Sequence, residues 1–270
     1  MNLNRKIIEK NCEEFFALYD FTRDNIRRMC ERKIIHTRSV AGNCDLLAKE
    51  LGLEPYDCDL AWTAGELHDF ARFGQAVVTK TFRDSERYNH AHLGASLLFT
   101  HGMIEDIIPD YDRMSVTDKK VLEKAVYHHS DYELPDTLDE RERLFCEIVQ
   151  DADRIDIFRN IVESGWDDMY GCSKEELLSS KISPDIATAL LHSVMADYNK
   201  RKTPADCFLA HMALCFGLQS DAARKTAAGQ GFIYKLLDIT FKDPYDQNVF
   251  AGIRSNIEAF LKNDTKTRGL

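Results

Sequence analysis

The amino-acid sequence predicts an all-α protein. Apolar residues recur at intervals of three and four along most of the chain, as they do on one face of an α-helix. The alternation of apolar and polar residues that is typical of β-strands is almost absent. Only 6 prolines and 13 glycines interrupt the 270 residues. The length is sufficient for one domain with a sizeable core, or for one domain with an extension.

Several helices are expected in the first part of the chain. Residues 40–52 carry an apolar repeat that stops at Gly52, and glycine suits the end of a helix because it adopts left-handed backbone easily. Comparable repeats predict further helices at 58–70, 90–101, 117–128 and 140–163. The last of these ranges is either one long helix or two abutting helices.

The second part of the chain is also expected to be helical. The periodicity breaks at GWDDMYGCSK, near residues 165–174. Beyond this break, helices are expected at 185–199, 204–217, 220–229, 230–240 and 245–262. We therefore expect three parts: an N-terminal helical segment (1–30), a core (31–163), and a C-terminal helical extension (164–270) packed on the core.

Composition excludes several classes of protein. The net charge of −10 argues against a broad basic face that binds nucleic acid. The opening MNLNRKIIEKNCEEFF is charged throughout and lacks the apolar stretch of a signal peptide, and no apolar run is long enough to span a membrane. The 8 cysteines form no C-x-x-C pair and are expected to be reduced, mostly buried thiols. We expect a cytoplasmic protein.

Histidines and aspartates suited to bind a metal follow one another along the chain. Neutral imidazole and carboxylate are ligands of catalytic divalent metals, and a set without thiolates favours a hydrolytic site over a structural zinc. We expect these residues at helix ends or edges, which can converge on one pocket in a bundle. In chain order they are His36, the dyad His68-Asp69, His90, the pair His128-His129, and Asp151 and Asp153. The other histidines (His92, His101, His192 and His211) are expected to be core or surface residues.

The order of His36, His68-Asp69 and Asp153 resembles the HD superfamily of metal-dependent phosphohydrolases. The flanking sequences agree, since HTRSVAGNCDLLAKELG leads into AGELHDFAR, and VQDADRIDIFR is similar to the closing helix of that family. The resemblance covers about residues 31–160 and implies an HD-domain helical bundle. It also implies that these four residues hold a divalent ion (Mn, Fe, Co, Ni, Mg or Zn). Asp151 competes for the last position, but the family's pattern of Ala before the aspartate and a basic residue after it selects Asp153.

Further histidines resemble those of the HD members that bind two ions. His90 in NHAHLGASLLF lies four residues before Gly94, as in the H-x-x-x-G helix of those members, and YHHSDYELP is similar to their His-His step. The resemblance implies a second ion held by His90, His128 and His129, with Asp69 bridging the two ions. The Gly-Tyr-Pro signature of the HD-GYP phosphodiesterases is missing, which argues against cleavage of cyclic dinucleotides.

A phosphate-binding site also needs positive charge. Arg72 falls where the two-ion members carry a lysine, and Arg154 follows the last expected ligand. A guanidinium can bind two phosphate oxygens at once, so both arginines are expected to act in catalysis together with Asp69. Weaker candidates precede His90 in the chain. They are Lys80, Arg83 and Arg87.

These features together predict a hydrolase that cleaves a phosphate ester or anhydride with water activated by metal. By resemblance, the substrate is a small phosphorylated molecule, with nucleotides as the favoured class. Two alternatives stay open. Some HD proteins are oxygenases that use a di-iron centre with a similar ligand set, and a non-catalytic sensor or scaffold could share the same helices.

Overall fold

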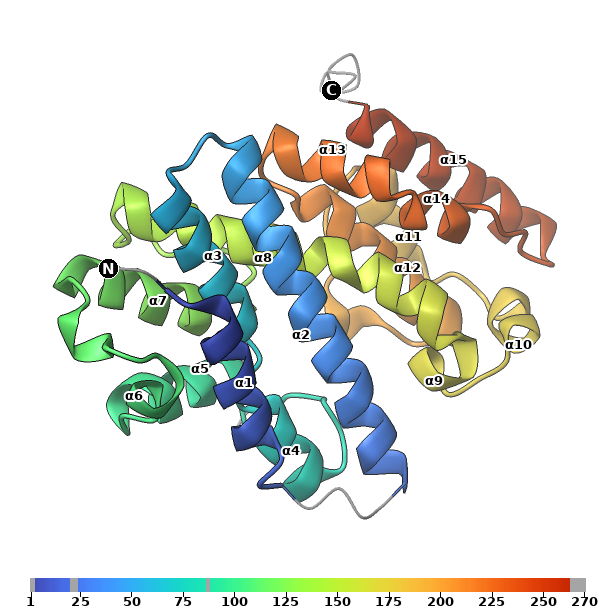
Figure 1. Cartoon of the computed structure of the whole chain (residues 1–270). Coiled ribbons are helices and arrows are strands. Elements are labelled where there is room, and N and C mark those ends of the chain that lie inside the picture. The colour runs from blue at the N-terminus through green and yellow to red at the C-terminus, as the bar shows by residue number, and fades with distance from the viewer. Residues whose placement is uncertain (1–2, 20–23, 86–87, 263–270) are drawn as a thin grey trace. The chain divides into compact units, whose positions relative to one another are not determined.

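The structure is a computed structural model of the chain and describes residues 3–19, 24–85 and 88–262 (Figure 1). These residues form helices joined by short connections, and the pairing of Ser85 with Tyr88 is an isolated bridge outside any strand. The expected all-α fold is confirmed. Within the described ranges, no helix is both long enough and apolar enough to cross a membrane. The chain folds into two compact units that divide between Asp153 and Arg154.

The first unit contains the helices that bear the candidate ligands. Its α-helices are α1 (Arg5–Phe16), α2 (Asp24–Glu50), α3 (Pro55–Leu67), α4 (Arg72–Thr79), α5 (His90–Ala95), α6 (Ile104–Ile107), α7 (Val116–His128) and the first part of α8 (Glu140–Ser164). A π-helical turn, η1 (Ser96–Thr100), continues α5, and a 3₁₀ turn, η2 (Tyr111–Arg113), precedes α7. The range expected as one helix at 90–101 is therefore an α-helix followed by a π-helix, whereas residues 140–164 form a single helix.

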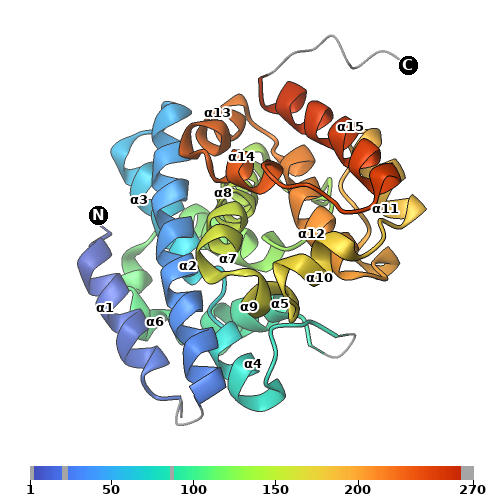
Figure 2. The same ribbon diagram turned by 90° about the vertical axis from the view of Figure 1, so that its right-hand side faces the viewer.

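Helices α2 and α3 lie side by side in Figures 1 and 2. Glycine at position 65 allows this close approach. A Cβ atom added to Gly65 would lie 2.8 Å from the Cα of Ala41 and 2.8 Å from the Sγ of Cys44. Both distances are shorter than van der Waals contact, so any larger residue at position 65 would push the helices apart. On α3 the contact lies about one turn before His68, and on α2 it lies between one and about two turns after His36.

Helix α2 begins earlier than expected. Its buried side chains include Ile26, Cys30 and Val40, which follow the helical repeat through a stretch that is otherwise highly charged. His36 consequently lies inside a long helix, and Asp153 lies inside α8. The expectation that the histidine ligands lie at helix ends or edges is wrong for His36, whereas Asp153 lies within the helical range expected at 140–163.

Stacked aromatic rings hold α1 against the residues around the dyad. The ring centroids of Phe16 and Phe73 lie 3.7 Å apart and those of Phe15 and Phe70 lie 4.4 Å apart. Phe70 follows the dyad directly and is fully buried. Burial of such rings contributes about 2–3 kcal/mol each relative to exposure, so the turn after α3 is firmly anchored.

The second unit is helical as well, and the described part of it ends with α15. After the end of α8, its elements are α9 (Trp166–Tyr170), α10 (Lys174–Ser179), α11 (Pro184–Leu191), η3 (Tyr198–Lys200), α12 (Pro204–Met212), η4 (Ala213–Gly217), α13 (Asp221–Gln230), α14 (Phe232–Leu237) and α15 (Pro244–Leu261). The helix expected at 185–199 is shorter, because Ser193 adopts left-handed backbone (φ 56°) directly after the C-cap at His192. The buried carboxylate of Asp206 accepts hydrogen bonds from the backbone N–H groups of Ser183, Lys202 and Thr203.

Candidate metal centre

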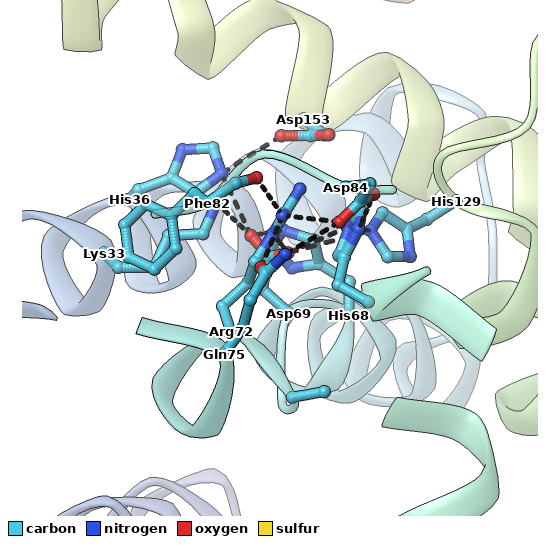
Figure 3. A network of polar contacts seen from close by, with 12 residues as sticks. Lys33, His36, His68, Asp69, Arg72, Gln75, Phe82, Asp84, His129 and Asp153 are labelled. Carbon is cyan, nitrogen blue, oxygen red and sulfur yellow. Dashed lines mark hydrogen bonds and ion pairs between the residues drawn. The ribbon is translucent and has the colours of Figure 1, made fainter. Parts of the chain in front are cut away.

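Imidazoles and carboxylates converge in the first unit (Figure 3). They come from segments far apart in the sequence. His36 lies within α2, His68 and Asp69 follow α3, His90 begins α5, His129 follows α7, and Asp153 lies on α8. The histidines and Asp69 are buried, whereas the side chain of Asp153 is 33% exposed.

One side of the cluster gathers His36, His68 and Asp153 around an oxygen of Asp69. The Nε2 of His36 lies 3.0 Å from Asp153 Oδ1 and 3.6 Å from Asp69 Oδ2, and the Nε2 of His68 lies 2.9 Å from Asp69 Oδ2. One potential ligand atom from each of His36, His68 and Asp153 lies within 4.8 Å of the others. This spacing suits a single ion, whose bonds to such ligands are about 2.0–2.2 Å long.

The other side gathers His90 and His129 around the second oxygen of Asp69. Asp69 Oδ1 lies 3.3 Å from the Nε2 of His90 and 3.8 Å from the Nε2 of His129. The two Nε2 atoms lie 2.9 Å apart. His68, Asp69 and His129 also offer ligand atoms within 4.8 Å of one another. The two oxygens of Asp69 therefore face two different sets of ligands, as in a carboxylate that bridges two ions.

The hydrogen bonds of the imidazoles show which ring nitrogens point inward as acceptors. The Nδ1 of His68 lies 2.6 Å from the carbonyl oxygen of Gly65, and the Nδ1 of His129 lies 2.7 Å from that of Val126. A carbonyl can only accept, so each Nδ1 carries the proton and each Nε2 presents a lone pair. The Nδ1 of His90 donates in the same way to a carboxylate, Asp84 Oδ2, at 2.6 Å.

The three inward lone pairs fit a cation. The Nε2 atoms of His90 and His129 face each other without a proton to share, and the buried Nε2 of His68 has no hydrogen-bond partner within the described residues. Buried acceptors that lack a donor are costly, and a divalent ion satisfies several of them at once. The residues present therefore fit a divalent metal.

The charge state of the cluster also suits metal binding. Burial alone would raise the pKa of Asp69, but His68, Lys33 and Arg72 outweigh it and hold this pKa well below its ordinary value. Burial lowers the pKa of His129 well below its usual range, and the charges of His90 and His68 lower it further. An ionised Asp69 and a neutral His129 are in the forms in which carboxylates and imidazoles bind metals.

Two cations flank the bridging carboxylate. Lys33 forms an ion pair with Asp69 Oδ2, and the Nε of Arg72 lies 3.3 Å from Asp69 Oδ1. The ring of Phe82 lies over both cations, with its centroid 5.9 Å from Lys33 Nζ and 5.9 Å from the guanidinium carbon of Arg72. Both cations are paired with carboxylates here, Lys33 with Asp69 and Arg72 with Asp69 and Asp84, in a protein whose net charge is −10.

The sequence-based search missed Lys33 and Asp84. Lys33 lies three residues before His36 in α2, so the two share one helix face, and that spacing was a usable signal. Asp84 lies in the irregular segment between α4 and α5, where no helical repeat predicts which way a side chain points. A lone aspartate six residues before His90 carries no recognisable pattern.

Some expected site residues lie elsewhere. His128 turns its Nδ1 to Asp131 Oδ2, at 2.7 Å, and packs its ring against Tyr127, because neighbouring helix residues point about 100° apart. The Nη1 of Arg154 donates to the carbonyl oxygen of Gly217, at 2.5 Å, inside the second unit. Each of these side chains thus has a hydrogen-bond partner outside the cluster.

Three of the remaining candidates, Asp151, Lys80 and Arg83, lie within the described residues. Asp151 is buried on α8. Lys80 and Arg83 are exposed, and the backbone of Arg83 accepts a hydrogen bond from Gln75 and donates one to Thr81. Arg87 lies outside the described residues.

Comparison with known families identifies this arrangement. The HD domain matches residues 34–157, a range that contains every converging ligand from His36 to Asp153. This part of the chain therefore belongs to the HD domain family, a superfamily of metal-dependent hydrolases. Comparison with curated proteins and with solved structures finds no match.

Proposed function

We propose that the protein is a metal-dependent phosphohydrolase that cleaves an ester or anhydride of a small phosphorylated molecule, with nucleotides as the favoured class. One observation carries the proposal. The buried carboxylate of Asp69 faces ligand sets on both sides, with two cations, Lys33 and Arg72, directly beside it. A centre for two ions next to fixed positive charge suits a phosphate group.

In this proposal His36, His68, Asp69 and Asp153 hold one ion, and Asp69, His90 and His129 hold the second. His128 is left out, since its ring packs on Tyr127 and its Nδ1 is engaged by Asp131. A bound divalent ion supplies Lewis acidity and lowers the pKa of water, so that a nucleophile is available near neutral pH.

The protein's own side chains supply position and charge. Lys33 and Arg72 would bind the phosphate oxygens and stabilise the negative charge that develops in the transition state. Asp69 holds both cations in place before the substrate arrives, so little reorganisation is needed. Phe82 covers the cations and reduces their exposure to water, which strengthens their attraction to phosphate.

The test combines metal analysis with a substrate screen. Purified protein should bind up to two divalent ions per chain, and it should release phosphate from one or more nucleotides or phosphomonoesters with Mn²⁺, Co²⁺, Ni²⁺ or Mg²⁺. Asp69→Ala should lose metal and lower hydrolysis by several orders of magnitude, because the shared ligand is gone. His92→Ala is the matched control: this ring stacks on Tyr127 rather than facing the cluster, and the variant should stay active.

Three results would contradict the proposal. They are wild-type protein that releases no phosphate from any substrate with any of the four metals, Asp69→Ala that keeps full activity, and protein that binds no ion. Iron retained through purification, together with substrate-dependent oxygen consumption, would favour the di-iron oxygenase. Ion binding without any turnover would favour the sensor.

A further inference from the structure

His90 is oriented differently from the other two inward imidazoles. His68 and His129 each donate from Nδ1 to the carbonyl oxygen three residues earlier, Gly65 and Val126 respectively. Their own helices therefore fix both rings. His90 is the first residue of α5 and has no helical turn before it that could offer such a carbonyl. Its ring depends on a partner from another segment.

That partner is Asp84, which is held by side chains of α4. Asp84 Oδ1 accepts from the Nη1 of Arg72 at 3.0 Å and from the Nε2 of Gln75 at 3.1 Å (Figure 3). Its other oxygen, Oδ2, accepts from the Nδ1 of His90. The backbone around it is tied to the same two side chains. Arg72 donates to the carbonyl oxygen of Phe82 at 2.5 Å, and the fully buried Gln75 donates to that of Arg83 at 3.2 Å.

We propose that Asp84 is the positioning residue for the ligand histidine His90. The carboxylate keeps the proton on Nδ1 and aims the lone pair of Nε2 at Asp69, and its charge makes the imidazole a stronger donor to a metal. The inference rests on the two-ion centre of the proposed function. It adds that Asp84, between α4 and α5, controls whether the second ion binds at Asp69, His90 and His129.

The arrangement also couples recognition to metal binding. Arg72 contacts Asp69 through Nε and Asp84 through Nη1, so the cation proposed for phosphate and the ligand proposed for the second ion are joined by one network. The side chain of Asp84 is 34% exposed, so water can solvate its charge and three side-chain partners are not needed to offset its burial. Its contacts are explained by the groups that it holds in place.

The first experiment measures the tautomer of His90 without metal. In protein with ¹⁵N-labelled histidine, the ring shifts of His90 should report a proton on Nδ1 in the wild type and a mixture of tautomers in Asp84→Asn. Asp131→Asn is the matched control, because Asp131 contacts the Nδ1 of His128 in the same manner outside the cluster. This variant should leave His90 unchanged. An unchanged tautomer in Asp84→Asn would overturn the proposal, whether or not the protein is a phosphohydrolase.

The second experiment measures binding of Mn²⁺ by calorimetry and metal analysis. Asp84→Asn should bind the first ion as the wild type does and the second about 10- to 100-fold more weakly, whereas Asp131→Asn should bind both normally. Gln75→Ala distinguishes the positioning of His90 from support of the segment around Asp84, because Gln75 contacts that segment but not His90. Gln75→Ala should therefore weaken binding of the second ion less than Asp84→Asn does. Equal affinities in Asp84→Asn and wild type would overturn the proposal. Wild-type protein that binds fewer than two ions would instead count against the proposed two-ion centre.

Discussion

Arg72 makes more contacts than a phosphate-binding residue requires. Its guanidinium reaches Asp69, Gln75, the carbonyl oxygen of Phe82 and Asp84, all of which belong to the cluster or to the segment beside it. The Nε donates to Asp69, while the two hydrogens of Nη1 are shared among Gln75, Phe82 and Asp84, and the single ammonium of lysine cannot occupy both positions. Charge alone therefore does not account for an arginine at this position.

We expect Arg72→Lys to keep the protein folded and to lower kcat/KM on the order of 100-fold, equivalent to about 2.7 kcal/mol of transition-state stabilisation. The ammonium keeps the charge but loses the paired contacts. Steady-state kinetics with the substrate found in the screen would measure the effect. Arg113→Lys, at an exposed arginine paired with Asp110, is the control and should change nothing. A value of kcat/KM within twofold of the wild type would show that charge alone suffices.

Residue identity and order predicted most of the converging side chains. Histidine is scarce, so His36, His68 and His90 stand out from the surrounding sequence, and their order carries a family pattern. Lys33 and Asp84 are common residue types whose role depends on where a long helix and an irregular segment bring them. The same limit applies to His128 and His129, since which of two adjacent rings faces the cluster depends on the rotation of α7.

At the scale of helices, the contact of α2 with α3 sets the distance between ligands that the two elements carry. Gly65 lies in this contact, whereas Gly42, which directly follows Ala41 in α2, has nothing within 4 Å of the position where a Cβ would lie. The two glycines therefore form a natural pair for testing. Gly65 is required by the close packing of α2 against α3, whereas Gly42 only lowers the stability of α2.

Gly65→Ala should lower the free energy of unfolding by about 1–3 kcal/mol and weaken metal binding, because the added methyl group separates α2 from α3. Gly42→Ala should leave metal binding unchanged and raise stability by up to about 1 kcal/mol, since alanine favours helix. Urea unfolding and Mn²⁺ titration of both variants would measure these effects. If Gly65→Ala proved as stable as Gly42→Ala, the helices could not be as close as described.

Periodicity located the helices better than it located their ends. The beginning of α2 falls in the expected N-terminal helical segment (1–30), but its continuation as one helix to Glu50 was not predicted, because charged residues surround its few apolar positions, such as Ile26 and Cys30. Helix α11 ended early at a left-handed serine, Ser193, which no rule of composition singles out. Helix ends depend on single backbone conformations, whereas helix centres depend on repeated burial.

At the scale of the whole molecule, the fold class followed from the apolar repeat, since hydrophobic burial drives folding along the entire chain. The boundary between the two units was harder to predict from the sequence. The two compact units meet between Asp153 and Arg154, within the continuous helix α8. Neither composition nor periodicity changes at that point.

His211 should make stability depend on pH. Burial, together with the positive charge of Arg201, lowers the pKa of His211 to about 4, compared with about 6.5 in the unfolded chain. Above pH 6.5 the ring is neutral in both states and its contribution is complete. As the pH falls from 6.5 toward 4, only the unfolded chain gains the proton, so the free energy of unfolding decreases, on the order of 2 kcal/mol for this partly buried ring.

Urea unfolding across that pH range would test the role of His211. His211→Gln keeps a polar partner for the hydroxyl of Tyr170, which lies 3.1 Å from Nδ1, but does not titrate. Its unfolding free energy should fall less steeply than that of the wild type between pH 6.5 and 4. Parallel curves for the two proteins would mean that His211 is protonated equally in both states. The other buried histidines are common to both proteins and cancel in the comparison.

The contrast between the net charge of −10 and the two cations beside Asp69 bears on how a substrate arrives. On the proposed function, an anionic substrate would meet a repulsive field at long range, and Lys33 and Arg72 would attract it only within the last few ångströms. Dissolved salt screens the distant field more than the short, buried contacts, over a Debye length of about 10 Å at 0.1 M. Moderate salt should therefore speed the encounter of enzyme and phosphate, the reverse of the behaviour of enzymes that steer their substrates by charge.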